Sequence, residues 1–402
     1  MERIYADNAG TTPMAAEVIE TMTEMMKNVF GNASAVSSFG REARRVLDES
    51  RHVIAESINA KSDNEIVFTS GGTESDNTAI MQTAFLRRNE GRHIITTAIE
   101  HEAVLKPMAF LESQGYEVTY LSVDENGIID LNELKDALRD DTILVSVMTG
   151  NNEVGSRQPI HEIGEIVSES NAWFHTDCVQ AYGILDVDVQ KDKIDLLSTS
   201  AHKLNGPKFL GFLYERDGLN LKAYLRGGDQ ELKRRAGTEN VPAIAGFAKA
   251  IELASADKKE LREKFQNLKK KLVEGLEHQE INFEINGLHD GSELPQIVSL
   301  WFKGCQSDAL LTNLDLNGIA ASAGSACTAG SLEPSHVLTA MYGNDSPRVS
   351  ESLRFSFGRY NTEEEVERII EVLSKTIKRM KKAGNKHGIR TKSKVARRYE
   401  NF

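Results

Sequence analysis

Lys203 is a candidate nucleophile because of its place in the sequence. It follows the apolar residues 194–198, which predict a strand, and lies in a turn of small residues that ends at Pro207. A lysine in such a turn is partly shielded from water. Desolvation lowers the pKa of its ammonium group and yields a reactive amine. A surface lysine is the simpler interpretation of Lys203 taken alone.

Asp177 is a candidate partner for a cationic ring. It follows a second apolar run, residues 173–176, and precedes Cys178, so its carboxylate should be buried and in need of a positive charge. The pyridinium nitrogen of pyridoxal phosphate is such a charge. A paired carboxylate keeps that nitrogen protonated, which makes the ring an electron sink. The competing interpretation is an aspartate that caps the next helix.

Two further features suit the same cofactor, although each is a weak signal alone. His101 follows the predicted strand 93–97, and its imidazole could stack on a ring or be an ordinary polar loop side chain. Gly71, Gly72 and Thr73 open a predicted helix at residues 75–86. Free backbone amides at such a turn can bind a phosphate.

Cys327 lies in a segment, residues 318–330, that consists almost entirely of small residues. Such a segment cannot fill a core, and we expect it to be mobile. A thiol there could enter a site, react and carry its product away, whereas Cys178 and Cys305 fit the usual role of a small buried hydrophobic residue. The reactivity of Cys327 remains a hypothesis, because it depends on the pKa of the thiol.

Arg354 falls within residues 352–359, whose alternating pattern predicts a strand. An arginine on a strand can hold a carboxylate through two parallel hydrogen bonds. The competing interpretation is a surface salt bridge.

The elements that position these residues alternate along the first two thirds of the chain. Short β-branched runs alternate with amphipathic stretches, which predicts a mostly parallel sheet with helices on both faces. Reactive residues follow the ends of several runs, and ligands of such sheets bind at the carboxyl edge. The predicted strands are residues 66–69, 93–97, 142–148, 173–176, 194–198 and 209–214.

A second pattern begins near residue 241 and predicts a smaller α+β domain. Apolar residues at helical spacing over 261–276 predict a long amphipathic helix, and residues 296–302 predict a strand. Thr362 and Glu365 form a capping signal for a helix over 362–382. Residues 386–402 hold six lysines and arginines against one glutamate, and we favour a solvated, disordered tail over one that docks on an acidic partner or RNA.

Composition excludes several classes of protein. The 402 residues carry a net charge of −12, a poor match for nucleic acid or an anionic membrane. Three cysteines without a CxxC pair exclude a disulfide scaffold and a four-cysteine zinc site, and we predict no metal site. We find no signal peptide and no apolar run of membrane-spanning length. We therefore expect a cytoplasmic protein with no membrane contact and no direct binding of nucleic acid.

The chain resembles the cysteine desulfurases of the NifS/IscS type, in the class V aminotransferase group of fold-type I pyridoxal-phosphate enzymes. The resemblance runs from Tyr5 to about Lys382. The loop around Cys327 resembles the desulfurase subgroup with the longer mobile loop. The most specific motifs are residues 68–77 (FTSGGTESDN), 151–155 (NNEVG), 202–208 (HKLNGPK), 324–328 (GSACT) and 331–338 (SLEPSHVL).

The resemblance implies a role for each matching residue. Lys203 would bind the cofactor aldehyde covalently, Asp177 would pair with the pyridine nitrogen, and His101 would stack on the ring and assist proton transfer. Asn152 and Arg354 would hold the carboxylate of the amino acid. The remaining cofactor residues would be Gln180 at the phenolic oxygen, Thr73, Ser200 and His202 at the phosphate with Gly72 beside it, and Thr238 at the phosphate of the other subunit of a homodimer.

The implied fold has a large cofactor domain, residues 14–258, with a mostly parallel seven-stranded sheet. Residues 1–13 and 259–385 would form the small domain that carries the Cys327 loop, and residues 386–402 the basic tail. The implied reaction converts L-cysteine to L-alanine and leaves a persulfide on Cys327. An acceptor protein would take that sulfur, either an iron–sulfur scaffold or an enzyme of tRNA thiolation.

Three alternatives remain open at this point. Transamination is disfavoured because it needs no thiol, whereas cleavage of selenocysteine could use the same site. A non-catalytic scaffold or RNA-binding protein that acts through the tail is disfavoured by the joint presence of Lys203, Asp177 and Cys327.

Overall fold

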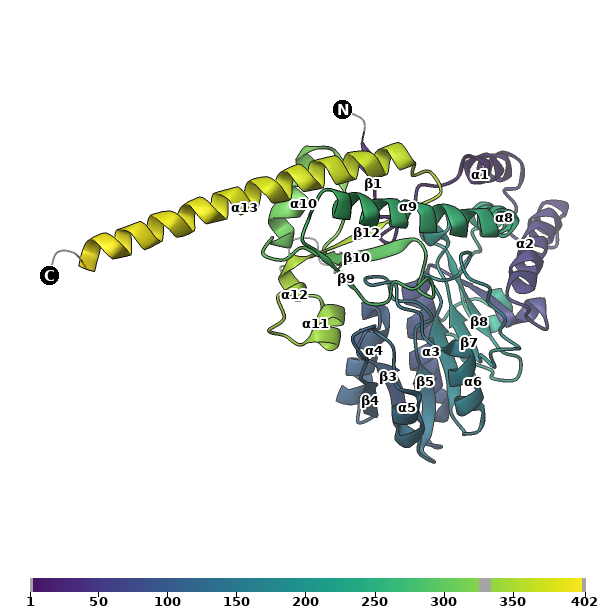
Figure 1. Cartoon of the computed structure of the whole chain (residues 1–402). Coiled ribbons are helices and arrows are strands. Elements are labelled where there is room, and N and C mark those ends of the chain that lie inside the picture. Colours follow the sequence, from purple (N-terminus) through teal and green to yellow (C-terminus); the bar gives the residue numbers. More distant parts are fainter. Residues whose placement is uncertain (1–2, 325–333, 400–402) are drawn as a thin grey trace.

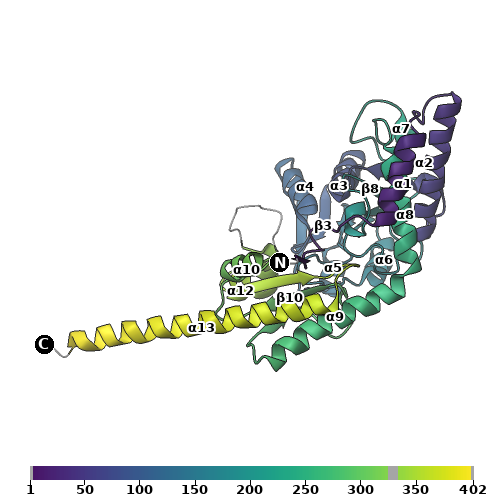
Figure 2. The same cartoon turned by 90° about the horizontal axis from the view of Figure 1, so that it is seen from above.

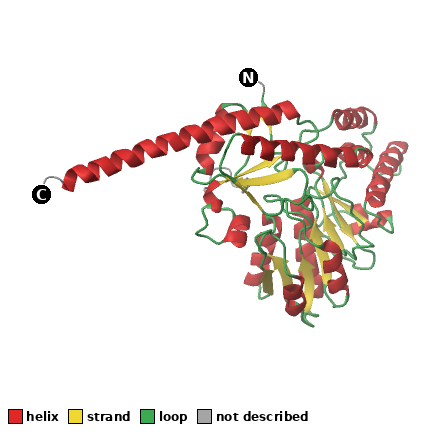
Figure 3. Ribbon diagram, in the orientation of Figure 1, coloured by secondary structure: helices red, strands yellow, loops and turns green. Residues whose placement is uncertain are grey.

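The computed structural model describes residues 3–324 and 334–399, with side chains described as far as residue 382. Helices surround two main sheets, a large one and a small one (Figures 1 and 3). None of the helices in the described part of the chain is long and apolar enough to cross a membrane.

The large sheet has seven strands in the order β2-β8-β7-β6-β5-β3-β4. Neighbouring strands run parallel except β8, which is antiparallel to both β2 and β7. The prediction of a mostly parallel seven-stranded sheet is therefore confirmed. Its strands are β2 (Ile66–Thr69), β3 (His93–Thr97), β4 (Glu117–Leu121), β5 (Thr142–Ser146), β6 (Trp173–Asp177), β7 (Leu196–Ser198) and β8 (Gly211–Glu215).

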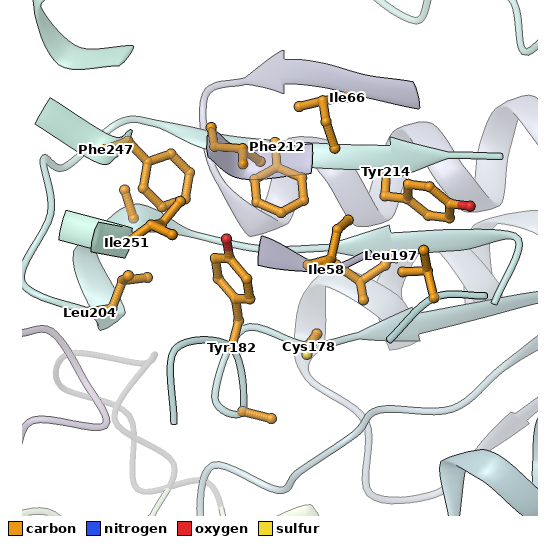
Figure 4. Close-up of a cluster of buried hydrophobic side chains, with 14 of the residues drawn as sticks. Ile58, Ile66, Cys178, Tyr182, Leu197, Leu204, Phe212, Tyr214, Phe247 and Ile251 are labelled. Atoms are coloured by element: carbon orange, nitrogen blue, oxygen red, sulfur yellow. The ribbon is translucent and has the colours of Figure 1, made fainter. Parts of the chain in front are cut away.

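The two faces of this sheet bury different clusters because successive side chains of a strand point to opposite sides. On β3, Ile94 packs with residues of α3 and α4, whereas Ile95 belongs to the cluster on the other face. That larger cluster includes Phe212, Tyr182 and Phe247 (Figure 4). The helices of this part are α1 (Ala16–Asn28), α2 (Ser38–Ser57), α3 (Gly72–Arg87), α4 (Glu102–Ser113), α5 (Leu131–Ala137), α6 (Ile160–Ser168), α7 (Gln230–Lys233) and α8 (Val241–Ala256), with 3-10 turns η1 (Asp63–Glu65) and η2 (Ala201–Lys203).

The small sheet is antiparallel, in the order β12-β10-β9, and has its own apolar core. Helix α13 lies beside α9 and α10 above this sheet (Figure 2). The N-terminal segment reaches this part of the molecule through β1, which pairs with β11. The elements are β1 (Ile4–Tyr5), α9 (Lys258–His278), β9 (Glu284–Asn286), β10 (Ile297–Trp301), α10 (Ser307–Leu316), β11 (Ile319–Ala320), α11 (His336–Tyr342), α12 (Arg348–Glu351), β12 (Ser352–Ser356) and α13 (Glu363–Tyr399).

The predicted helix after residue 362 is confirmed at its start and wrong at its end. Glu365 accepts a hydrogen bond from the Thr362 amide and donates its own amide to the Thr362 hydroxyl, which is the reciprocal cap that the sequence indicates. The helix then continues to Tyr399 and projects away from the body of the molecule (Figure 1). A disordered tail from residue 386 is therefore a wrong prediction for the backbone, because the helix does not end at residue 382.

Some other elements differ from the prediction. Helix α3 begins at Gly72 and not at Ser75. Strand β8 begins at Gly211, because Phe209 has a φ of 58°, which is incompatible with a strand. Strand β4 was not predicted, because its pattern of exposed and half-buried residues lacks the apolar run used to find the others.

Candidate active site

A cavity of about 940 Å³ lies at the carboxyl edge of the large sheet. It is lined by almost all of the predicted site residues, which come from segments far apart in the sequence. Thr238 does not line it and is exposed, and Cys327 lies outside the described residues. The predicted residues that line the cavity are Gly72, Thr73, His101, Asn152, Asp177, Gln180, Ser200, His202, Lys203 and Arg354.

Lys203 ends the 3-10 turn η2 that follows β7, and its side chain reaches the N-terminal segment. Its Nζ atom donates hydrogen bonds to the carbonyl oxygens of Ala9, at 2.5 Å, and Gly10, at 2.9 Å. The side-chain amide of Gln180 donates to the same Ala9 carbonyl at 3.0 Å. These carbonyls hold the amine at the wall of the cavity, where a bound carbonyl compound could reach it.

Asp177 is the last residue of β6 and is only 5% exposed. One carboxylate oxygen accepts a hydrogen bond from the Val179 amide at 2.8 Å. Burial raises the pKa of the Asp177 carboxyl, while the nearby charges of His101 and Lys203 lower it. A buried carboxylate at a cavity wall is stabilised by a cationic ligand group, so this position fits a pyridinium nitrogen.

His101 caps helix α4, and this contact determines its tautomer. The Nδ1 atom accepts a hydrogen bond from the Ala103 amide at 3.1 Å, so in the neutral ring the proton is on Nε2. Burial lowers the pKa of His101 and therefore favours that neutral form. A neutral imidazole can stack on an aromatic ring and can exchange a proton at Nε2.

The first turn of α3 is the segment predicted to bind a phosphate. Gly71 has a φ of 142°, a value that favours glycine, and a Cβ at Gly72 would lie 2.8 Å from a methyl group of Val179. The turn therefore packs closely on the neighbouring loop, beside the Ser200 hydroxyl. Because the amides of a helix N-terminus have no partner within the helix, they can bind a phosphate here.

His202 lines the same end of the cavity, and its Nδ1 atom lies 2.9 Å from the Thr11 hydroxyl. Burial and the charges of Lys203 and Lys208 lower the pKa of His202 to about 4. The ring is therefore neutral at pH 7 and can act as a hydrogen-bond donor without adding charge.

Arg354 lies on β12, in which every residue is buried, and is itself only 2% exposed. Its Nη2 atom lies 2.6 Å from the Asp7 carboxylate, and its Nη1 atom donates to the carbonyls of Asn152, at 2.8 Å, and Gly324, at 3.3 Å. The interpretation as a surface salt bridge is therefore wrong. Asp7 was missed, although it lies in the N-terminal motif, because an aspartate in a short polar segment gives no sign of its partner.

Glu153 was also missed as a site residue. It is 2% exposed and accepts a hydrogen bond from the Ser335 hydroxyl. Burial raises the pKa of Glu153, while that hydrogen bond and the charges of His336 and Arg354 lower it. The one sequence signal for Glu153 was its place next to Asn152 in the 151–155 motif.

Comparison with known proteins places this geometry in a family. The sequence model of the family described as "Aminotransferase class-V" matches residues 4–369. A putative cysteine desulfurase IscS 1 of Bacillus subtilis is 53% identical over 380 residues, which cover 94% of this chain and all of that protein. The chain belongs to the IscS/NifS-type cysteine desulfurases of the class-V aminotransferase family. That family is pyridoxal-phosphate dependent, in agreement with the cavity described above.

Two solved structures that share about a third of their residues with this chain have the same fold. A NifS-like protein superimposes with a TM-score of 0.87 at 35% identity, over 94% of this chain and 100% of that one. A structure described as SspA in complex with cysteine has a TM-score of 0.77 at 36% identity, over 89% of this chain and 100% of that one. The fold of this chain is thus that of NifS-like proteins.

Proposed function

We propose that this chain removes the sulfur of L-cysteine, releases L-alanine and keeps the sulfur as a persulfide on Cys327. One observation carries the proposal. Lys203, Asp177 and Arg354 line one cavity together with Gly324, which precedes Cys327 by three residues. Three residues of extended chain span at most about 10 Å, so the chain length keeps Cys327 within that distance of Gly324 at the cavity wall.

Pyridoxal phosphate fits the residues present and would supply an electron sink for a carbanion at Cα. The amine of Lys203 would bind its aldehyde, the carboxylate of Asp177 its pyridine nitrogen and the ring of His101 its face. Gln180 would donate to its phenolic oxygen. The phosphate would lie at the start of α3, held by the Gly72 backbone, Thr73, Ser200 and His202.

The protein's own groups would then bind the substrate and move its protons. Arg354 and Asn152 would hold the substrate carboxylate. The Lys203 amine, held at the cavity wall by its carbonyl contacts, would take the proton from Cα. His101, protonated on Nε2 when neutral, would exchange a proton with the substrate thiol.

Cys327 would act as the sulfur acceptor. Its thiolate attacks the substrate sulfur, so an S–S bond forms as the Cβ–S bond breaks. The electron pair of the broken bond stays on carbon, which takes up a proton and leaves as part of L-alanine. A later acceptor thiol can attack the outer sulfur and free Cys327.

We further propose a homodimer and an acceptor protein as partners. Thr238 is exposed and does not line the cavity of its own chain, which suits a residue that contributes to the phosphate site of a second copy. The acceptor would be an iron–sulfur scaffold or a tRNA-thiolation enzyme.

Mass spectrometry of the cysteine-containing peptides tests the proposal. After the protein with bound pyridoxal phosphate reacts with L-cysteine, the Cys327 peptide should carry one additional sulfur atom. Cys178 and Cys305 provide matched controls in the same molecule, because both thiols are buried. An unmodified Cys327 peptide, or sulfur spread over all three cysteines, would contradict a Cys327 persulfide.

A further inference from the structure

Glu153 is buried between Gly324 and Ser335, which lie on either side of residues 325–333 in the sequence. Its backbone is held in place by Asn151, whose side-chain oxygen accepts hydrogen bonds from the amides of Glu153, at 2.8 Å, and Val154, at 3.0 Å. Asn151 is itself held by a hydrogen bond from its side-chain amide to the Ile99 carbonyl. The Glu153 carboxylate is therefore presented from a rigid turn.

On one side, this carboxylate binds the residue that starts helix α11. Its Oε2 atom accepts a hydrogen bond from the Ser335 hydroxyl. The same hydroxyl oxygen accepts a hydrogen bond from the Leu338 amide, so Ser335 caps α11. His336 follows Ser335, and its Nε2 atom lies 2.9 Å from the carbonyl oxygen of Glu100, the residue before His101.

On the other side, the same oxygen atom packs against Gly324. Gly324 has a φ of 100°, and a Cβ built there would lie 2.5 Å from Oε2 of Glu153. The Gly324 amide donates to the Ser322 hydroxyl, and its carbonyl accepts from Nη1 of Arg354. One carboxylate oxygen thus touches both Gly324, directly before residue 325, and Ser335, two residues after residue 333.

Arg354 connects this arrangement to the proposed substrate site. Its Nη1 atom donates both to Gly324 and to the carbonyl of Asn152, the residue before Glu153. Arg354, which would hold the substrate carboxylate, and Glu153, which contacts Gly324 and Ser335, are therefore parts of the same buried cluster.

We propose that Glu153 is a positioning residue for sulfur transfer: it fixes the chain on both sides of residues 325–333 relative to Arg354, and so sets where Cys327 can meet the substrate sulfur. The inference rests on the proposed function, since it concerns the step that uses Cys327. Glu153 contacts Gly324 and Ser335 directly but has no direct hydrogen bond to Arg354, so steps that need Lys203 and Arg354 but no thiol should depend on Glu153 far less than sulfur transfer does.

Two reactions of the pyridoxal-phosphate-loaded protein separate these steps. Alanine formation from L-cysteine needs Cys327, whereas exchange of the Cα hydrogen of L-alanine in deuterated water needs only Lys203 and the bound substrate carboxylate. Glu153→Ala should slow alanine formation by about 10- to 100-fold, the usual effect of a lost hydrogen bond to an acidic group. The exchange rate should stay within about twofold of the wild type. Glu153→Gln, which keeps an acceptor for Ser335, should recover most of the lost rate.

Two variants control for simple loss of structure. Ser335→Ala breaks the same hydrogen bond from the other partner, and the double variant Glu153→Ala/Ser335→Ala should be no slower than the worse single variant. Glu65→Ala removes another buried glutamate, which accepts hydrogen bonds from the Lys61 and Asp217 amides away from the cavity. It should lower stability without changing the ratio of the two rates.

A third measurement does not depend on turnover. The rate at which iodoacetamide alkylates Cys327 should differ from the wild-type rate by about threefold or more in Glu153→Ala. The same rate should be unchanged in Glu65→Ala. Equal loss of both reaction rates in Glu153→Ala, or unchanged rates and alkylation, would overturn the inference. A wild-type protein that forms no alanine from L-cysteine would instead refute the proposed function, and the alkylation comparison would still decide whether Glu153 positions Cys327.

Discussion

The carboxylate of Asp7 lies 2.6 Å from Nη2 of Arg354. The arginine that would bind the substrate carboxylate therefore already holds an acid contributed by the N-terminal segment. The other guanidinium nitrogen of the fork, Nη1, is occupied by the carbonyls of Asn152 and Gly324. A substrate carboxylate must consequently share the positive charge of Arg354 with Asp7.

Asp7→Asn should separate the two effects of this pair. The variant should bind L-alanine more tightly, because one negative charge beside the substrate carboxylate is removed. It should also be less stable by about 1–3 kcal/mol, because the buried guanidinium loses a charged partner. Thermal unfolding with and without L-alanine checks both parts: a lower Tm in the free variant and a larger rise on adding ligand.

Arg354→Lys is the matched control, since it keeps the charge but loses the planar fork of donors. It should raise the KM for L-cysteine by about tenfold or more. A smaller ligand-induced rise in Tm for Asp7→Asn than for the wild type would contradict competition at Arg354.

Lys203→Ala should abolish turnover without unfolding the protein. The side chain is half-buried and donates hydrogen bonds to the backbone carbonyls of Ala9 and Gly10, so its loss should leave the fold in place. Removal of the group that moves the Cα proton should slow alanine formation by at least about 100-fold. Circular dichroism and Tm should stay close to those of the wild type. Turnover near the wild-type rate would refute the assignment of Lys203.

The pH dependence of stability should carry the signature of His175. This residue is fully buried on β6, with Nδ1 2.8 Å from the Ser146 hydroxyl and Nε2 3.0 Å from the Ser198 hydroxyl. Burial lowers its pKa to about 3. Between pH 6.5 and pH 3 the unfolded chain therefore binds a proton that the folded chain does not, so stability falls as the pH falls.

His175→Gln removes this titration and keeps groups able to hydrogen-bond both serines. Its free energy of unfolding should fall less steeply than that of the wild type between pH 6 and pH 4, by up to about 1.4 kcal/mol per pH unit. Urea unfolding at several pH values measures the two slopes. Identical slopes would show that His175 does not remain neutral in the folded protein.

The basic segment 386–402 should affect delivery of sulfur and not its release. Deletion removes six positive charges from the far end of α13, distant in sequence from the cavity residues. Alanine formation with a small reducing thiol should be unchanged. Transfer of labelled sulfur to an acidic acceptor protein should slow by about tenfold at low salt and by less at high salt. Unchanged transfer at low salt would exclude a docking role.

Much of the site was predictable because its residues follow strands. Asp177 and Lys203 come directly after apolar runs, and in a mostly parallel sheet the ends of such runs converge on one edge. Gly71 and Gly72 were a weaker signal, which the structure explains by a positive φ at Gly71 and a close approach of Gly72 to Val179. An apolar run and the polar residue that follows it are features of local sequence, so a single chain reveals them.

The residues that were missed act through contacts between distant segments. Asp7 meets Arg354 across most of the chain, and Glu153 meets Ser335 only because the two parts of the molecule pack together. No periodicity in the sequence reports such a pair. The antiparallel direction of β8 was likewise not predictable from its residues, because burial on both faces gives the same apolar run in either direction.

The most direct test of the account is the formation of alanine from L-cysteine by the wild type and by Cys327→Ala, with pyridoxal phosphate and a reducing thiol present. The account predicts alanine from the wild type and almost none from the variant. Equal amounts from both would mean that sulfur leaves without Cys327 and would favour a selenocysteine-type lyase. No alanine from either protein would contradict desulfuration altogether.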